Sequence, residues 1–431
     1  VAIASGATTT GMGRSGTVDW QTGSIKTGDF TAVDTQGFFV DTNSGAVTAT
    51  LPAGSAGSII SFQDYRNNFN TNALTISPNG SEKINGGAGS IVLSTNGEGV
   101  TLVYIDSTIG WRSIQDNVFS DVGSNFITAT GGTITTVDTN YKVHTFTSPG
   151  TFQVTSAGSG DGNLIDYLVV AGGGGGPASQ GGGGGAGGFR ESQHAPYAPV
   201  YTASPLKSTT SLPVSIQSYP ITVGAGGSTT PSCAKASNGS DSVALTITSA
   251  GGGAGGTRFG SPPAYPGNSG GSGGGGGGCA STGGSGNTPP TTPAQGNDGA
   301  DNAGPDGAAS GGGGATAAGA VGGPGRGQAG GAGGAGATTS ITGTPVAYAG
   351  GGGGGEGGPP GPRQGGAGGS SVGGTGSTSP PGSSPGSGTP GTAGTTNRGG
   401  GGGGGGNNSA SNGREGGAGG SGIVVIRYKF Q

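Results

Sequence analysis

The sequence predicts an all-β protein: short antiparallel β modules followed by a glycine-rich sandwich of polyglycine II helices, with essentially no α-helix. Three observations predict it. Short apolar–polar alternations recur between residues 35 and 170, glycine rises abruptly after residue 170, and apolar strand-like segments close the glycine-rich region at both ends. Alternation with a period of two marks half-buried strands, and no helical period of useful length accompanies it.

The change in composition divides the chain. Of the 112 glycines, 24 precede residue 171, which leaves 88 in the remaining 261 residues; of the 26 prolines, 3 precede it and 23 follow. We therefore expect a docking segment or connector at 1–34, a β module at 35–117, a second β module at 118–170 and a glycine-rich domain at 171–431. A C-terminal strand at 423–430 is expected to close that domain.

The first β module begins with a short strand at Phe39 and Val40 and a turn at 42–45. Val47, Ala49 and Leu51 then alternate with threonines, as in a half-buried strand. Further strands are expected at 58–63, 74–77, 91–93, 100–106 and 111–115, separated by turns rich in Asn and Gly. Such short strands must protect their edges by closure or by association.

The second β module leads directly into the first glycine run. Its strands are expected at 132–136, 141–147, 150–155 and 164–170, and we expect His144 to have a structural role inside its strand.

Seven glycine-dense runs follow, at 172–176, 181–185, 251–253, 273–278, 311–314, 350–355 and 399–406. Polyglycine II has three residues per turn and no internal hydrogen bonds, so its backbone groups point sideways. Such helices can exchange hydrogen bonds only where no Cβ intervenes. Because ordering glycine costs more entropy than ordering other residues, several rods must form together. Adjacent strands at 164–170 and 423–428 would hold both ends of the region in one sheet.

A disordered Gly/Ser linker is the alternative for such a composition. Aromatic and proline-stiffened interruptions at 189–221, 257–268 and 338–348 argue against it, because they are typical of loops that hold a shape. A collagen triple helix is excluded, since the triplet pattern at 358–363 lasts only two repeats.

The charge and the absence of known motifs argue against several classes of function. The net charge is −4 and charged residues make up 8%, without a Lys/Arg cluster that nucleic-acid binding needs. No apolar run approaches the roughly 20 residues of a membrane span. The acidic residues Asp298, Asp301 and Asp306 do not follow the EF-hand spacing, and no phosphate-binding loop motif occurs. We expect no enzyme, no metal and no cofactor.

Three elements resemble one known family in the expected order. They are the string 166–171 followed by five glycines, the Tyr-Pro-Ile-Thr-Val-Gly-Ala-Gly-Gly element at 219–227 and the closing Gly-Gly-Ser-Gly-Ile-Val-Val-Ile-Arg-Tyr at 419–428. Together they resemble the glycine-rich domain of bacteriophage tail-fibre and adhesin proteins, and the phrases at 37–45, 72–77 and 100–111 resemble modules in fibres of marine bacteriophages. The resemblance implies a virion fibre or adhesin, a polyglycine-II-type sandwich, a homotrimer, contacts with other tail proteins and loops that bind a host receptor, a polysaccharide or an outer-membrane protein.

Receptor contacts are expected in the aromatic interruptions, because Tyr, Trp and Arg anchor many binding surfaces. The candidates are Phe189, Arg190, His194, Tyr197, Tyr201, Arg258, Phe259 and Tyr265. Arg363, Arg398 and Arg414 are weaker candidates, and covering the bundle ends is the alternative role for the aromatic residues. Cys233 and Cys279 are either a disulfide or two inert thiols.

The expected function is therefore host recognition by a structural virion protein. A self-assembling extracellular filament and an ice-binding or other surface-binding polyglycine protein are alternatives, and a depolymerase is a third. Irregular interruptions argue against flat ice-binding ranks, and no convincing carboxylate or histidine site supports a depolymerase.

Overall fold

Outside the glycine-rich rods, β-strands are the main secondary-structure elements of the described residues. The structure is a computed structural model that describes residues 18–114, 126–158, 160–193, 201–230, 234–258, 265–358, 364–380, 388–406 and 414–431, apart from the side chains of 160 and 161. Within these ranges the helices are the short 3₁₀ turns η1 (Gly160–Asn163) and η2 (Gly369–Ser371), and none is α-helical. The all-β prediction is confirmed. No helix in the described part is long and apolar enough to cross a membrane.

The chain forms two units. The first comprises the described residues up to Phe126 together with Ala157–Asn163, and the second comprises Ile127–Ser156 and Leu164–Gln431. The strands predicted at 132–136, 141–147, 150–155 and 164–170 thus belong with the glycine-rich region.

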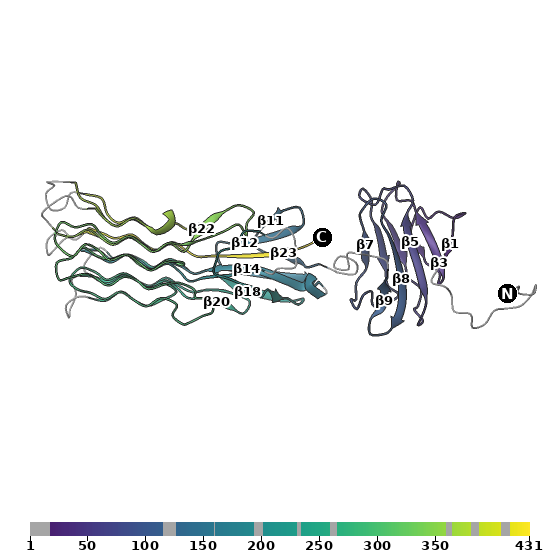
Figure 1. Cartoon of the computed structure of the whole chain (residues 1–431), viewed down its shortest axis with the longest axis horizontal. Helices are drawn as coiled ribbons and strands as arrows, with labels where there is room; N and C mark the ends of the chain where they lie inside the picture. Colours follow the sequence, from purple (N-terminus) through teal and green to yellow (C-terminus); the bar gives the residue numbers. More distant parts are fainter. Residues whose placement is uncertain are drawn as a thin grey trace, which may run out of the picture. The chain divides into compact units, whose positions relative to one another are not determined.

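The first unit is a sandwich of two sheets (Figure 1). One sheet has the order β1 (Asp19–Trp20), β3 (Gln36–Val40), β5 (Ile59–Asp64), β8 (Gly99–Asp106), β9 (Gly110–Ser113). The other has the order β2 (Phe30–Thr31), β4 (Val47–Thr50), β6 (Leu74–Ser77), β7 (Ile91–Leu93).

Strand direction in this unit differs from the prediction. The chain crosses to the opposite sheet after each of its first five strands, so β1, β3 and β5 run parallel, as do β2, β4 and β6. Antiparallel pairing holds for β7, β8 and β9 with their neighbours. The expectation of antiparallel modules is therefore corrected for the first six strands. Alternation with a period of two marks a half-buried strand but not the direction of its neighbour.

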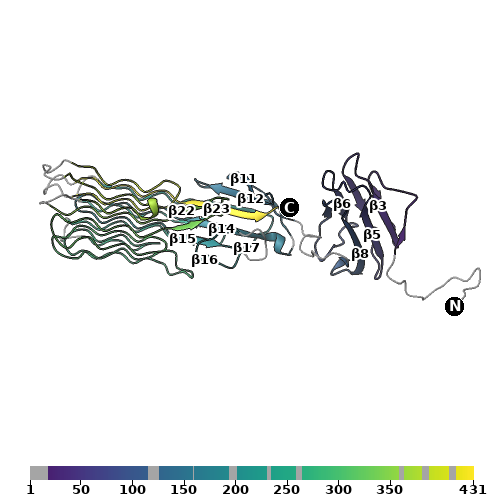
Figure 2. The same cartoon turned by 45° about the horizontal axis from the view of Figure 1, so that its top comes forward.

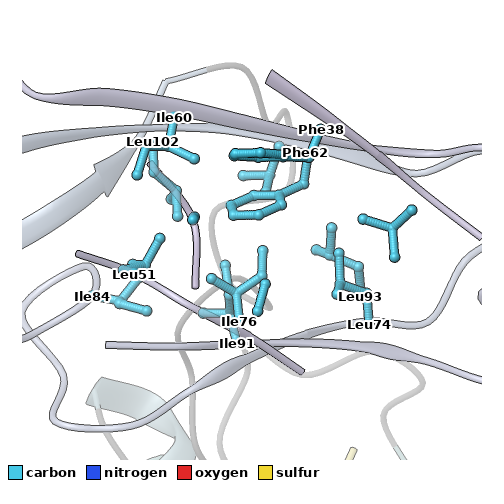
Figure 3. Close-up of a cluster of buried hydrophobic side chains, with 14 of the residues drawn as sticks. Phe38, Leu51, Ile60, Phe62, Leu74, Ile76, Ile84, Ile91, Leu93 and Leu102 are labelled. Atoms are coloured by element: carbon cyan, nitrogen blue, oxygen red, sulfur yellow. The ribbon is translucent and has the colours of Figure 1, made fainter. Parts of the chain in front are cut away.

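The core between these sheets is made of aliphatic and phenylalanine side chains from both (Figure 3). Phe38 and Phe62 stack with ring centroids 5.9 Å apart, and both are almost fully buried. Alternation then places the next residue of β3, Phe39, on the opposite, outer face of its sheet.

The second unit contains two larger sheets and one hairpin. One sheet has the order β11 (Thr133–Val137), β12 (Tyr141–Phe146), β23 (Ile423–Lys429), β14 (Leu164–Val170), β15 (Phe189–Ser192), β16 (Lys207–Ser208), and β17 (Leu212–Pro213) also pairs with β14. The other has the order β10 (Thr128–Thr130), β13 (Gly150–Ser156), β18 (Ser218–Thr222), β19 (Ser242–Ala244), β20 (Ile247–Ser249). β21 (Ala337–Thr339) and β22 (Val346–Tyr348) form the hairpin.

β14 and β23 lie at the centre of this unit and hold both ends of the glycine-rich region. They pair antiparallel from Asp166 with Arg427 to Val170 with Ile423, as the sequence predicted for adjacent closing strands. One face of the pair packs on the core around Phe152, and the other packs on a core that includes Phe189 and the β21–β22 hairpin. Burial on both faces explains why both strands are nearly continuous apolar runs.

The glycine-rich region consists of rods with three residues per turn (Figures 1 and 2). In the run 181–188, every third backbone N–H donates to the same neighbouring segment, where the accepting residue also steps by three. The N–H groups at 181, 184 and 187 donate to the carbonyls at 405, 402 and 399, and those at 182, 185 and 188 donate to the carbonyls at 256, 253 and 250. This register is that of a threefold helix with sideways hydrogen bonds, as in polyglycine II.

The run 181–188 lies inside the bundle. Among the described residues it exchanges backbone hydrogen bonds with six other segments, at 171–174, 250–256, 272–275, 310–313, 352–355 and 399–405. Six neighbours around one threefold rod satisfy donors and acceptors on every side without side chains. The expected bundle of packed rods is therefore present, and the linker alternative does not describe it.

His144 of β12 connects the sheet to the turn before β11. Its Nδ1 lies 2.7 Å from the Gly131 carbonyl oxygen and its Nε2 lies 3.0 Å from the Tyr428 hydroxyl. Since Nδ1 must donate to the carbonyl, the neutral ring accepts the Tyr428 hydrogen at Nε2. Burial is the main cause that lowers the pKa of His144, and Lys142 adds to it.

We expect the second unit to lose stability as the pH falls below about 6.5, the ordinary histidine pKa. With a folded-state pKa below the unfolded one, the unfolded chain binds more protons in that window, so unfolding becomes easier with acidification. Thermal unfolding between pH 7.5 and 5 measures this loss of stability. The variant His144→Gln is expected to show a flatter profile over this window, and an equally steep profile would contradict the assignment.

Candidate functional site

The tip of the bundle is the end of the rods away from β14 and β23, where the run 172–176 turns at 177–180 into the run 181–188 (Figure 2). Lateral hydrogen bonds place several other segments at the same level: Gly182 donates to Gly256, Gly405 donates to Pro177, and Gly355 donates to Gly181. The turns at this level carry the charged side chains described below. Along the rods themselves, the buried glycines offer only backbone.

The turn at 177–180 is tight, because Ser179 and Gln180 both have φ near +50 to +60°. Its fully buried Gln180 accepts a hydrogen bond from Arg258 through Oε1, while its buried Nε2 has no hydrogen-bond partner among the described residues. Arg258 also donates to Asp306, 3.0 Å away. One arginine thereby connects two turns that are far apart in the sequence.

Asp306 accepts a hydrogen bond from a second arginine, Arg326, at the surface of the tip. Arg326 Nη2 lies 3.3 Å from Asp306 Oδ1, and the side chains of Arg326 and Asp306 are 58% and 44% exposed. The hydrogen bond from Arg326 is the main cause that lowers the pKa of Asp306, and Arg258 contributes. The exposed guanidinium is therefore held in place by a carboxylate that stays ionised.

A second charged pair at the tip is buried. Arg414 donates to Glu356 Oε1, with side chains 8% and 0% exposed, and Ser379 donates to the same oxygen over 2.7 Å. Arg414 also reaches the carbonyl of Thr378. Burial lowers the pKa of Arg414. The pair joins the rod that ends at 356 to the segments around 378 and 414.

The chain is similar to one family of known proteins. The model of a family described as glycine-rich domain matches residues 146–429, which is more than half of the 431 residues. The chain belongs to the glycine-rich domain family. The match extends from the last residue of β12 to the last residue of β23, so the glycine-rich domain includes the strands that close the bundle. No curated protein matches the chain.

The glycine-rich domain places the predicted receptor residues at two opposite ends. Arg258 and Tyr265 lie at the tip, where Thr257 pairs with Tyr265 and Lys235 Nζ lies 5.8 Å from the Tyr265 ring centroid. Phe189, Arg190 and Tyr201 lie at the sheet end instead. His194, Tyr197 and Phe259 lie outside the described residues, as does Arg363.

Phe189 and Tyr201 are core residues rather than loop residues. Phe189 is 1% exposed on β15, and Tyr201 is 9% exposed, with its hydroxyl donating to the Ser192 carbonyl over 2.7 Å. The reason is that β15 pairs with β14, which places Phe189 in the sheet, and that Tyr201 is tied to β15 by its hydrogen bond to Ser192. The expectation that these two rings lie in an exposed loop is corrected, and the alternative that aromatic residues cover the bundle end describes them.

Charged groups in this core have identified partners. Arg427 is 2% exposed, lies 4.1 Å from the Tyr141 ring centroid and donates to Asp138 over 2.8 Å. Glu191 accepts hydrogen bonds from the Ser204 N–H and from Thr339, and burial is the main cause that raises its pKa. These contacts hold the segment after β15 and the β21–β22 hairpin against the sheet.

Other candidates occupy defined positions. Arg398 donates to the Ala347 carbonyl at the sheet end, over the Tyr348 ring. Asp298 and Asp301 accept backbone N–H groups of Gly286 and Gly283. Cys279 is half-buried, and Cys233 lies outside the described residues, so a disulfide between them stays a prediction.

Sequence reasoning missed Gln180, Arg326 and Glu356. One signal was available for Glu356: it directly follows a glycine run, where burial is expected, and a buried charge needs a partner. The pairing itself could not be read, because Glu356 and Arg414 are 58 positions apart.

Proposed function

We propose that this chain is a structural protein of a bacteriophage virion, a tail fibre or adhesin that attaches the particle to its host cell through the tip of the glycine-rich domain. The observation that carries the proposal is that the rods pack through their backbone, whereas the turns at the tip expose side chains. The rods bury backbone against backbone, whereas the tip turns carry side chains, among them exposed Arg326 and Asp306 and half-buried Tyr265 and Lys235. Arginine and tyrosine are among the most frequent anchors of binding surfaces.

Contacts that connect the described turns of the tip support recognition. Arg258 connects the turns at Gln180 and Asp306, and Glu356 with Arg414 connects three further segments. Turns that are already ordered lose less conformational entropy when a receptor binds. The polar and charged tip fits a cell-surface polysaccharide or an outer-membrane protein as receptor.

We propose a binding function without catalysis or cofactor. Carboxylates of the glycine-rich domain have partners within the structure itself: Asp298 and Asp301 accept backbone N–H groups, and Glu356 is buried with Arg414. We further propose that the chain assembles as a homotrimer with other tail proteins and acts outside the cell. Sedimentation of the purified chain tests the oligomeric state, and a monomer over a wide concentration range would refute it.

Binding to cells tests the tip directly. The full chain, fluorescently labelled at its N-terminus, is incubated with a panel of marine bacterial strains and measured by flow cytometry. We expect a subset of strains to be labelled, and we expect the double variant Arg326→Glu, Tyr265→Ala to reduce labelling at least about tenfold, as loss of anchor residues does.

The matched control is Ile216→Ser, which changes a side chain that is 66% exposed at the sheet end. It is expected to label cells as the unchanged chain does. Equal labelling by the tip variant, or equal loss in the control, would contradict recognition through the tip.

A further inference from the structure

Three aromatic side chains form a row on the outer face of the first unit. Trp20 of β1, Phe39 of β3 and Tyr65, directly after β5, lie on three neighbouring parallel strands. The ring centroids of Trp20 and Phe39 are 4.9 Å apart, and those of Phe39 and Tyr65 are 6.4 Å apart. We call these three residues the aromatic row. Phe38 and Phe62 fill the core on the other face, so the row is not part of that core.

The row is both exposed and held in place. Trp20 is 40% and Tyr65 49% exposed, although large aromatic side chains usually gain most from burial. A Cβ on Gly37 would lie 2.7 Å from two atoms of the Trp20 ring. The ring thus lies against the bare backbone of β3 at Gly37.

Hydrogen-bonding groups lie beside the row. Gln63 is directly opposite Phe39 in the β3–β5 register. Asp41, two residues beyond Phe39, accepts a hydrogen bond from Arg66 Nε over 2.7 Å, and the Arg66 guanidinium lies 5.5 Å from the Tyr65 ring centroid. The charges of Asp41 and Arg66 cancel, so the row offers apolar ring faces with polar, electrically balanced neighbours.

The small exposed area of the aromatic row favours a small ligand over a protein partner. A large aromatic side chain has about 150–250 Å² to bury, so two that are 40–50% exposed offer on the order of 200 Å². A stable protein interface needs about 800 Å² from each partner. The row is therefore too small to anchor a protein by itself, while it matches the face of a few sugar rings.

We propose that the aromatic row binds a neutral oligosaccharide. One face of a hexose ring exposes C–H groups, which the negative faces of aromatic rings attract, and the hydroxyls at its edge need donors and acceptors such as Gln63, Asp41 and Arg66. The balanced charge of the site favours an uncharged glycan over an anionic one. This site is separate from the tip and adds a second, carbohydrate-specific contact to the chain.

Intrinsic fluorescence can report this binding, because the chain has two tryptophans and only Trp20 is exposed, Trp111 being fully buried. The full chain is titrated with maltohexaose, cellohexaose, chitohexaose and mannohexaose, and with a heparin hexasaccharide as the anionic comparison. We expect at least one neutral probe to shift the emission to the blue and to protect Trp20 from iodide quenching, and we expect heparin to do neither.

Calorimetry with the same probe then compares variants. Trp20→Ala is expected to abolish binding, and Tyr65→Ala and Gly37→Ala to weaken it about tenfold, as loss of one aromatic contact does. Val92→Ala, which changes a 52% exposed residue of the other sheet, is expected to bind normally. Circular dichroism confirms that each variant is folded.

Three results would overturn the proposal: no response to any neutral probe, unchanged affinity in Trp20→Ala, or an effect of Trp20→Ala on self-association alone. The tip variant Arg326→Glu, Tyr265→Ala is expected to keep the response. If it loses the response, the sugar binds at the tip and the row is not the site. Cell labelling that fails while the sugar response persists would instead count against the proposed tip function only.

Discussion

The variant Gly184→Ala is expected to destabilise the second unit by at least about 3 kcal/mol, through steric overpacking and lost backbone hydrogen bonds. A Cβ at this position would lie 2.0 Å from the carbonyl oxygen of Gly174, in a rod that six segments surround. The obstacle is backbone and cannot rotate away. Relief requires moving the rod 172–176, whose N–H and carbonyl groups are engaged in lateral hydrogen bonds.

Gly325→Ala is the matched control. It makes the same chemical change at a glycine whose added Cβ would meet nothing within 4 Å. We expect its stability to change by no more than about 0.5 kcal/mol, as for most surface substitutions. Denaturant unfolding of both variants measures the difference, and similar midpoints would show that the bundle tolerates side chains inside it.

The second large effect is expected at the buried pair of Glu356 and Arg414. Replacing either partner alone leaves the other charge buried without its counter-ion, which costs about 3–5 kcal/mol in known cases. Ser379 donates to the same Glu356 oxygen, so Glu356→Ala also removes an acceptor from that hydroxyl. We expect this loss to appear as faster hydrogen exchange at the tip.

The double variant Glu356→Leu, Arg414→Met completes the cycle. Removing both charges is expected to restore most of the stability that either single change loses, because an apolar pair needs no counter-ion. Losses that simply add in the double variant would contradict coupling between the two side chains. Cell labelling by the same variants shows whether the order of the tip matters for recognition.

The longer strands could be predicted from the sequence, and the shortest could not. β14 and β23 were identifiable because each is a seven-residue strand of mostly apolar residues beside a glycine-rich segment. β1, β2, β16 and β17 span two residues each, too few for alternation to appear. The parallel direction of the first six strands was hidden for another reason: it depends on crossings between sheets, which leave no residue pattern.

The sequence predicted side chains at the ends of the rods, but not which of these side chains lie together. Glycine composition and polyglycine II geometry were enough to expect packed rods with side chains at their ends. Aromatic residues after a glycine run were read as an exposed loop, but Phe189 pairs within β15 and is buried. The tip ion pairs depend on which rods are neighbours, and identical glycine runs carry no information on their order.

The antiparallel pairing of β14 with β23 also has a mechanical consequence. A pull on the tip travels down the rods, which continue the direction of both strands (Figure 1). The hydrogen bonds between antiparallel strands are perpendicular to the strands, so such a load shears them together instead of opening them one at a time. The strand pair that closes the glycine-rich region would therefore resist a pull on the tip along the rods through all of its hydrogen bonds at once.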